Sequence, residues 1–320
     1  PAALDTIING VRFLSNSPKL GVKPAVLLDA IALRKGELYR EKNLQKTNQR
    51  LGNLGAFRFV AVRPQRDTAH PDKIDIGVSL TKSKRLAVSP DLSASYSNLD
   101  ISKAKWLLGL TGSGTIRSRN LFNGAEQGTL TGEYSIAFDP QKSKGEGRNF
   151  VNSQDFRLQT EVIVPRFVDY FGLWHGISRL PDEEDKILRR ALPRFLEALR
   201  TDAQLRFNLS YDYREQFDYF TISTVGASAG YDLRTSQSKQ YAIRHFGVDA
   251  LLPNTKPKFD DILADRLFLK KSFGKYLLTG LLFREFAYNY SKKQAFGGRQ
   301  RALHLRTELS GAEIGGATAL

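Results

Sequence analysis

The sequence of 320 residues contains no cysteine and no methionine. Without cysteine, these residues support neither thiol catalysis nor a cysteine-based zinc site nor a disulfide. The absence agrees with a cell-envelope protein that avoids stray disulfides, and equally with a fragment whose cysteines lie elsewhere. The lack of methionine and the start at Pro1, with no signal peptide, indicate a processed, truncated or incomplete sequence.

Long hydrophobic runs are also missing. The longest candidate, Tyr276 to Phe283, is far shorter than the ~18 apolar residues that a membrane-spanning helix needs. A helical membrane protein is therefore excluded. The mean hydropathy of −0.36 is typical of soluble proteins, but a membrane β-barrel has a similarly low average because half of each strand faces a wet lumen.

Residues that carry catalysis are sparse and scattered. Gly112-Ser113-Gly114 lacks the spacing of a nucleophile elbow and lies within a strand pattern. The acidic residues from Asp182 to Asp185 are typical of a helix start, not of an acid/base pair. The four histidines are isolated and lack metal-ligand spacing; they are His70, His175, His245 and His304. The sequence therefore predicts no enzyme, no metal site and no cofactor.

The net charge of +15 raises the question of nucleic-acid binding. The basic residues are scattered, as in Lys82, Lys84 and Arg85 and again in Lys270 and Lys271, without a dense run or a single basic helix. This distribution argues against nucleic acid as a partner. Anionic lipid head groups or a solvated surface are the preferred explanations.

Alternating hydrophobicity is the strongest positive signal. An Asn-Gly pair within Asn120 to Glu126 is flanked by long alternating segments, which is typical of a β-hairpin. From Leu205 to Arg214, apolar and polar residues alternate over ten positions without exception. A tilted strand that crosses a bilayer needs ~9 to 11 residues, whereas strands in soluble sheets usually have ~5 to 6.

Residues 83–320 read as strands almost throughout. The pattern predicts nine: Arg85–Tyr96, Leu107–Arg119, Gly128–Phe138, Asp155–Val164, Gln204–Arg214, Tyr219–Leu233, Gln240–Leu251, Lys275–Tyr288 and Ala302–Leu309. Bacterial single-chain barrels have an even number of strands. The count therefore indicates a missed strand or, as we prefer, an unfinished barrel.

The first of these strands has two chemically different faces. Its alternation predicts a lipid-facing set of Leu86, Val88, Leu92, Ala94 and Tyr96, and a lumen-facing set of Arg85, Ser89, Asp91, Ser93 and Ser95. Pro90 lacks an N–H group and therefore belongs at a sheet edge or a bulge. Its alternative place is the membrane entrance, where its unpaired neighbours are hydrated.

Residues 1–82 predict a small α+β domain in the order β-α-α-β-β. The expected elements are a strand at Thr6–Phe13, helices at Pro24–Ala30 and Glu41–Leu54, and strands at Phe57–Arg63 and Ile74–Leu80. Gly55 is placed to end the second helix. A sheet covered on one face only leaves an edge for a partner, for which the candidates are Ile74, Ile76, Val78 and Leu80.

A helical insertion near residues 181–200 interrupts the strands. Asp182 to Arg200 carries leucines and Phe195 at helical spacing, with acids first and bases later, and Pro193 is expected to kink or split it. Two interpretations are open: a loop helix that covers its own barrel, and an interfacial helix at the membrane.

Several segments in order resemble the BamA/TamA outer-membrane assembly superfamily. Lys23 to Leu80 is similar to its last POTRA domain, with Gly36, Tyr39, Leu51, Leu54-Gly55 and Phe57 as marks. Within the superfamily the TamL branch is the most similar, by the Asn120–Glu126 turn, Val164-Pro165-Arg166-Phe167 and Leu267 to Tyr290. The chain departs from the family in having one POTRA domain and no Arg-Gly-Phe loop motif, as truncation at each end would produce.

The resemblance implies a mainly β protein, in which an α+β POTRA domain precedes a 16-stranded antiparallel transmembrane barrel with a weak seam between its first and last strands. It also implies the outer membrane of a Gram-negative bacterium, a TamB-like periplasmic partner, and outer-membrane protein clients or phospholipid. Three alternatives are a BamA-type insertase, a passive porin or transporter barrel, and a soluble β-sandwich.

Overall fold

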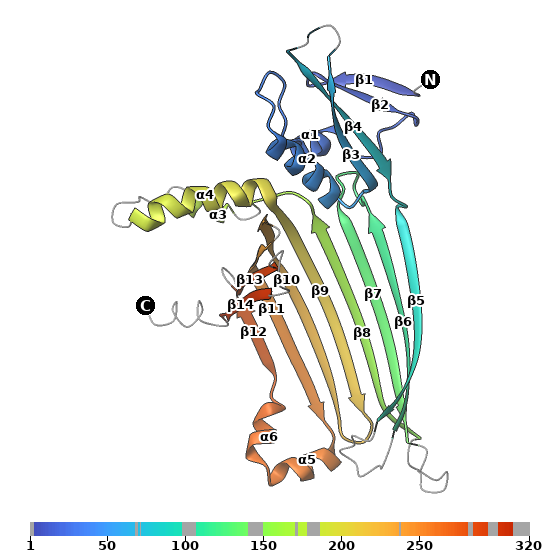
Figure 1. Ribbon diagram of the computed structural model, residues 1–320. Coiled ribbons are helices and arrows are strands. Elements are labelled where there is room, and N and C mark those ends of the chain that lie inside the picture. The colour runs from blue at the N-terminus through green and yellow to red at the C-terminus, as the bar shows by residue number, and fades with distance from the viewer. Residues whose placement is uncertain are drawn as a thin grey trace. The chain divides into compact units, whose positions relative to one another are not determined.

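The computed structural model is mainly β and describes residues 3–67, 70, 72–97, 107–139, 150–169, 172–177, 186–236, 238–280, 284–293 and 300–309. The chain divides into two compact units (Figure 1). The first comprises residues 1–87 with 117–128 and 163–165, and the second comprises residues 88–116, 129–162 and 166–320.

The first unit begins with a hairpin of strands β1 (Leu4–Ile8) and β2 (Val11–Ser15). Asn9 and Gly10 both have positive φ, as a two-residue type I′ turn requires. The predicted single strand Thr6–Phe13 is therefore wrong. Arg12 donates two hydrogen bonds to Asp5 across the hairpin and holds the pKa of that carboxyl below its ordinary value.

Two helices follow, and both agree with the sequence prediction. Helix α1 spans Pro24–Ala30 with proline in its first turn, and α2 spans Glu41–Asn53. Gly55 has φ +65° and follows the end of α2, as predicted for a helix stop. The helices meet in an apolar core of Val22, Val26, Leu27, Ala30, Leu51, Leu54, Ala56 and Ala125.

The unit ends in a second hairpin of strands β3 (Phe57–Arg66) and β4 (Ile74–Lys82). Among the described residues, β1–β2 and β3–β4 form separate two-stranded sheets. The order is thus β-β-α-α-β-β, with one strand more than the predicted β-α-α-β-β, because the Asn9-Gly10 turn divides the first strand.

The loop Asn120–Glu126 belongs to the first unit and completes its core. Ala125 is fully buried there, and Lys23 N–H donates to the Asn123 carbonyl at 2.7 Å. The buried Glu126 carboxylate accepts from the N–H groups of Phe122 (3.1 Å) and Gly124 (2.9 Å). Positive φ falls on Asn120, Asn123 and Ala125 and not on Gly124. The predicted hairpin is therefore present, but with a seven-residue loop in place of a tight Asn-Gly turn.

The second unit is built on a ten-stranded antiparallel sheet. The loop Asn120–Glu126 connects two of its strands. Its order is β14-β13-β11-β10-β9-β8-β7-β6-β5, and β12 also pairs with β11. The strands are β5 (Leu86–Ser97), β6 (Leu107–Arg119), β7 (Gln127–Phe138), β8 (Val151–Val164), β9 (Ala203–Gln216), β10 (Phe220–Ser236), β11 (Lys239–Thr255), β12 (Tyr276–Gly280), β13 (Glu285–Lys293) and β14 (Gln300–Glu308).

The sequence predicts these strands with one exception. The expected strand Lys275–Tyr288 is two strands, β12 beside Gly247–Leu251 of β11 and β13 beside Lys239–Arg244 of the same strand. Within the described residues the sheet is open, with β5 at one edge and β14 at the other.

The polar face of the sheet carries ion pairs that join neighbouring strands. Arg157 of β8 pairs with Asp212 of β9 at 2.6 Å, and Arg206 of β9 pairs with Asp232 of β10 at 2.6 Å. Further contacts on this face are Arg214–Asp155, Arg206–Glu161, Arg244–Asp232, and the hydroxyl pairs Thr111–Ser135 and Thr115–Thr131.

The opposite, apolar face consists of the even-numbered residues of β5 to β8 and the odd-numbered residues of β9 and β10. Its large side chains are exposed in unusual number: Leu86, Val88, Leu92, Tyr96, Leu108, Leu110, Ile116, Leu130, Tyr134, Phe156, Leu158, Phe207, Leu209, Tyr211 and Val225. Monomeric soluble proteins rarely leave so continuous an apolar surface open to water. The two faces therefore have the chemistry of a wall between lipid and a wet lumen.

In the described residues, four helices accompany the sheet. Helices α3 (Leu173–Ile177) and α4 (Lys186–Asp202) lie in the connection between β8 and β9, and α5 (Pro257–Ala264) and α6 (Leu267–Ser272) follow β11 (Figure 1). The sequence predicts only α4; Asp182–Asp185 lie outside the described residues, and the helix runs through Pro193 without being split. No described helix has both the length and the apolar character needed to span a membrane.

Candidate functional site

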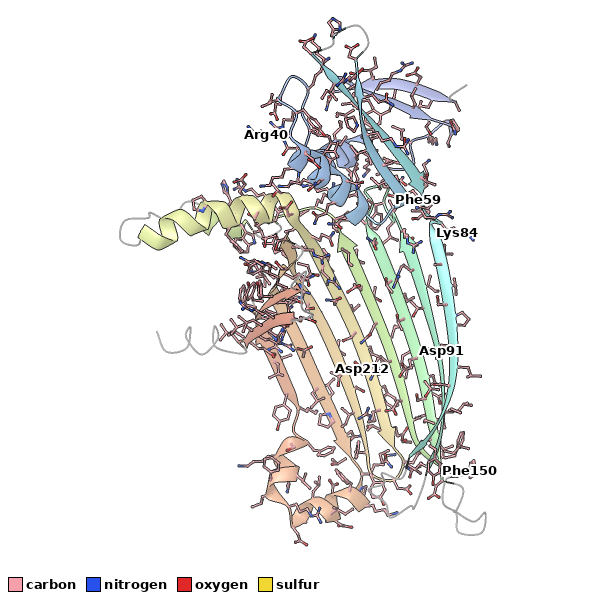
Figure 2. The ribbon with its side chains drawn as sticks, viewed as in Figure 1. Arg40, Phe59, Lys84, Asp91, Phe150 and Asp212 are labelled. Atoms are coloured by element: carbon pink, nitrogen blue, oxygen red, sulfur yellow. The ribbon has the colours of Figure 1, made fainter. Side chains whose placement is uncertain are left out.

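The free edge of β5 is the first candidate site. Within the described residues, β5 has β6 as its one neighbour (Figure 1). Figure 2 labels Asp91 on this strand at the margin of the sheet. The apolar side chains of β5 are exposed as well, since Leu92 is 75% exposed and Val88 is 60% exposed. Both the backbone and the side chains of this edge are thus available to another strand.

The hydrogen bonds of the β5–β6 pair fix which residues face the free edge. Arg119 N–H donates to the Arg85 carbonyl at 2.7 Å, so these two residues form a hydrogen-bonded pair. In an antiparallel ladder the backbone groups of successive residues point to opposite sides. Odd-numbered residues of β5 therefore bond to β6, and the even-numbered residues direct their N–H and C=O groups to the free edge. These residues are Leu86, Val88, Pro90, Leu92, Ala94 and Tyr96.

Pro90 consequently leaves the β5–β6 ladder intact. Its missing N–H is on the free side, where a closing strand would otherwise receive a donor. A strand that pairs with this edge finds an acceptor but no donor at Pro90. The missing donor therefore affects only the free edge of β5.

Side chains of β5 are expected to divide between two environments. These 320 residues contain no native cysteine, so each candidate can be labelled singly once any cysteine elsewhere in the full-length protein has been replaced. In lipid bilayers a spin label at Leu92 should be accessible to oxygen and protected from a water-soluble relaxant, and a label at Ser93 should show the reverse. Paramagnetic accessibility measurements on the full-length protein test this, and equal water access at both positions would overturn the assignment.

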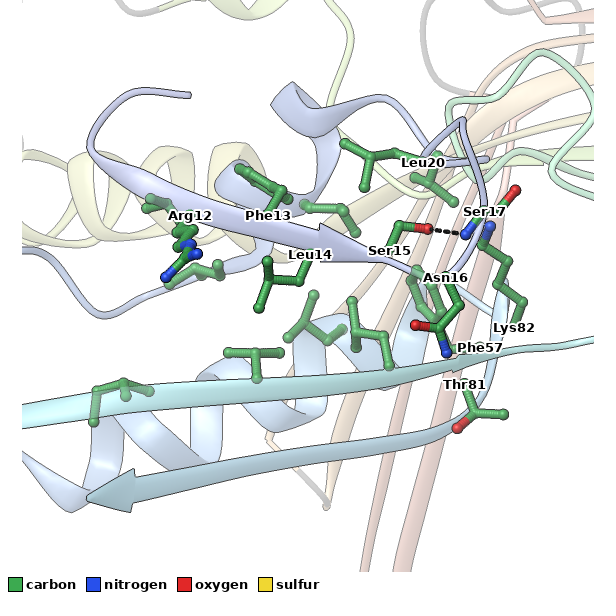
Figure 3. Close-up of a pocket in the computed structure, with 18 residues that line it drawn as sticks. Arg12, Phe13, Leu14, Ser15, Asn16, Ser17, Leu20, Phe57, Thr81 and Lys82 are labelled. Carbon is green, nitrogen blue, oxygen red and sulfur yellow. Dashed lines mark hydrogen bonds between the residues drawn. The ribbon is translucent and has the colours of Figure 1, made fainter. Parts of the chain in front are cut away.

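A groove in the first unit is the second candidate site. It lies between β2 and β4, has a volume of about 590 Å³, and is closed at its base by Leu27 and Leu51 of the two helices. Figure 3 shows Phe13, Leu14 and Ser15 of β2 on one side and Thr81 and Lys82 at the end of β4 on the other. The lining is mostly apolar.

Three of the four edge residues predicted in β4 line this groove. Ile76, Val78 and Leu80 line it, whereas Ile74 is exposed (44%) and does not. In the described residues β4 pairs only with β3, and β2 only with β1. Each strand therefore has an unpaired edge, and an extended segment added to such an edge gains backbone hydrogen bonds. The use of these residues by a partner remains a prediction.

Little in the described residues has the form of a catalytic centre. No group of three or more histidine, aspartate or glutamate side chains in those residues is arranged to hold a metal ion. His70 contacts Asp67 at 2.9 Å, and His245 is fully buried against Trp174 and Tyr231. The sequence shows these histidines as isolated. Only the fold brings His245 next to Trp174, which is 71 positions away along the chain.

Comparison with known proteins identifies the N-terminal domain. Residues 6–82 match the POTRA family, described as a surface antigen variable number repeat. No curated protein matches the chain. Among solved structures, the chain is similar to the crystal structure of BamA from Haemophilus ducreyi lacking POTRA domains 1–3, with 13% identity and a TM-score of 0.46. The similarity covers 90% of this chain and 46% of that one, so the chain spans about half its length.

Proposed function

We propose that the chain is part of an outer-membrane assembly barrel of the TamA/TamL type. The observation that carries the proposal is a POTRA domain followed by a two-faced sheet whose first strand has a free edge. In this role the domain lies in the periplasm and the sheet is part of the barrel wall, in the outer membrane of a Gram-negative bacterium. The activity is one of templating and membrane perturbation, without catalysis.

The dimensions of the apolar face support a membrane wall. On β9 the face runs over the nine residues from Leu205 to Tyr213, close to the ~9 to 11 residues with which a tilted strand crosses a bilayer. Beyond it, polar contacts take over on the same face: Glu215 accepts from Gln154 and pairs with Lys256, both at 2.8 Å. A polar rim at the limit of an apolar band is the arrangement expected at a membrane surface.

The free edge supplies the mechanism that we propose. The outward N–H and C=O groups of β5 would template an incoming strand of an outer-membrane protein client. Alternatively, β5 would separate from the closing strand to admit phospholipid. The missing donor at Pro90 would keep the closed seam weak enough to open. A BamA-type insertase is the alternative that uses the same edge. A passive porin or transporter barrel would need neither this edge nor a POTRA domain.

A TamB-like periplasmic protein is the partner proposed for the groove of the POTRA domain. Ile76→Asp places a charge in the groove, and it should weaken capture of that partner about tenfold or more, because an unpaired carboxylate loses solvent there. Phe59→Asp is the matched control, since Phe59 lies on β3 in the same hairpin, is 61% exposed and does not line the groove.

Quantitative pull-down with the full-length protein measures this effect, and circular dichroism confirms that both variants are folded. Equal capture by the two variants would reject the groove as the docking site. Deletion of residues 1–82 tests whether the POTRA domain as a whole is needed for binding. The barrel should still insert into the membrane but no longer bind the partner. Unchanged binding after that deletion would show that the POTRA domain is not the docking site for the partner.

A further inference from the structure

Helix α4 packs on the apolar face of the sheet and not on its polar face. Helix α4 contacts β9 and β10, and Trp174 packs against both Phe195 of α4 and Tyr231 of β10. Leu205 of β9 and Tyr231 of β10 are register partners and belong to the odd-numbered, apolar set. The helix therefore lies outside the proposed barrel wall, on the side that faces lipid.

An aromatic cluster holds α3 and α4 in this position. Trp174 of α3 contacts Phe195 of α4, with ring centroids 5.8 Å apart, and also contacts Tyr231 and His245. The Tyr231 hydroxyl donates to the Val168 carbonyl in the preceding connection. These contacts place the helix pair at the end of the sheet where β8 ends and β9 begins. By the alternation of antiparallel strands, this is also the end at which β5 begins.

The composition of α4 suits the surface of a phospholipid leaflet. Between Lys186 and Asp202 the sequence has five basic residues, Lys186, Arg189, Arg190, Arg194 and Arg200, and two acidic ones, Glu197 and Asp202. Figure 1 shows the helix extending outward from the start of β9. A basic amphipathic helix at the limit of an apolar band lies at the level of lipid phosphates, where each Lys or Arg attracts anionic head groups.

A shallow groove lies next to this helix on the same apolar face. Its floor is Ala227 and Ala229 of β10, and it is flanked by Thr160, Val162, Phe207, Leu209 and Phe246. Its volume is about 350 Å³. Ala229 and its register partner Phe207 are two residues along their strands from Tyr231 and Leu205, on the two strands that α4 contacts. An apolar trough thus runs from the helix toward the middle of the band.

We infer that α4 and this groove form a binding site for one phospholipid of the leaflet at the end of the sheet where β9 begins. An acyl chain lies in the trough over the two alanines, and the phosphate lies at the level of the basic helix. The inference rests on the proposed membrane placement of the sheet. The inference goes beyond that placement, because it assigns a lipid site to β8–β11, strands that lie away from the β5 edge.

Filling the groove tests the acyl-chain half of the site. Ala227→Phe places a ring where the chain would lie, and Val225→Phe is the control on the same strand and face, because Val225 is 40% exposed and does not line the groove. Native mass spectrometry of the full-length protein in detergent, titrated with phosphatidylglycerol, should show about tenfold weaker binding for Ala227→Phe alone. Equal binding by both variants and the unmodified protein would overturn the inference.

Head-group dependence tests the helix half. A triple variant of Arg189, Arg190 and Arg194 to glutamine should lower phosphatidylglycerol binding and leave binding of phosphatidylcholine less affected. Equal loss for both lipids would reject the role of the charges. A groove occupied by a second copy would instead give a lipid-independent dimer, and so would contradict the lipid site.

A spin label at Leu209 in bilayers separates failure of this inference from failure of the proposed function. If Leu209 is accessible to water, the sheet is not a membrane wall and both proposals fall. If Leu209 is lipid-exposed and the Ala227→Phe variant binds lipid normally, the lipid site alone is rejected.

Discussion

Replacement of Gly230 by valine should prevent the sheet from folding. A β-carbon at this position would overlap the Ile243 carbonyl oxygen, and would lie 2.7 Å from Arg244 Cα and 2.9 Å from the Ile243 carbonyl carbon. All three atoms belong to the backbone of β11, so no side-chain rotation relieves the overlap. We expect a destabilisation of ~3 kcal/mol or more.

The close approach at Gly230 is produced by a β-bulge. Ala229 pairs with Phe246 and Gly230 with Arg244, which leaves His245 as the extra residue of β11. The bulge turns His245 into the cluster of Trp174 and Tyr231, where it is fully buried. A side chain at Gly230 would therefore disturb the strand pairing together with the packing of α3.

Gly114→Val is the matched control for this substitution. Gly114 lies within β6, and a β-carbon there would have no heavy atom within 4 Å. Refolding of the full-length protein into detergent, followed by heat-modified mobility on gels, measures the folded fraction. Gly230→Val should yield little folded protein and Gly114→Val a normal yield. A Gly230→Val variant with an unchanged folded fraction would show that the bulge geometry is wrong.

Sequence periodicity predicts this fold best where a segment is long and its surroundings are uniform. The prediction for β6 has the observed bounds, and α1 does too, because alternation, a proline start and apolar spacing are local signals. The missed β1–β2 hairpin has a local signal as well: Asn9-Gly10 is a strong turn pair. The missed helix α5 begins with Pro257, another signal of the same kind.

Other features depend on tertiary contacts, which the periodicity of the sequence does not reveal. The division into β12 and β13 follows from their pairing with two halves of β11. The packing of α4 on the apolar face requires both the bulge at His245 and the chain reversal that places Trp174 beside it. Likewise, the groove beside β4 exists because two hairpins distant in sequence face one another. The free edge of β5 was expected from resemblance, but the direction of each N–H required the hydrogen bond between Arg119 and Arg85.

That direction also determines where a disulfide can lock the seam. Even-numbered residues of β5 would form hydrogen-bonded pairs with a closing strand, and odd-numbered residues would form the non-hydrogen-bonded pairs, whose Cα atoms are only ~4.5 Å apart. The side chains of such pairs are also closer to one another, and this Cα separation lies within the range for a disulfide. Ser93 is therefore the preferred position on β5. The matched control is Ala94→Cys with Leu110→Cys, which locks β5 to β6 and leaves the seam untouched.

A disulfide between Ser93→Cys and a cysteine on the closing strand of the full-length protein should abolish activity, because the proposed function requires the backbone of β5 to separate from its partner strand. Reductant should restore activity, and the control lock to β6 should leave it unchanged. Activity is measured as insertion of an outer-membrane protein client and, separately, as phospholipid transfer between membranes. Loss of one activity alone identifies the client. Full retention of both in the locked protein would reject gating and leave a passive scaffold or pore, and Pro90 would then mark only a hydrated membrane entrance.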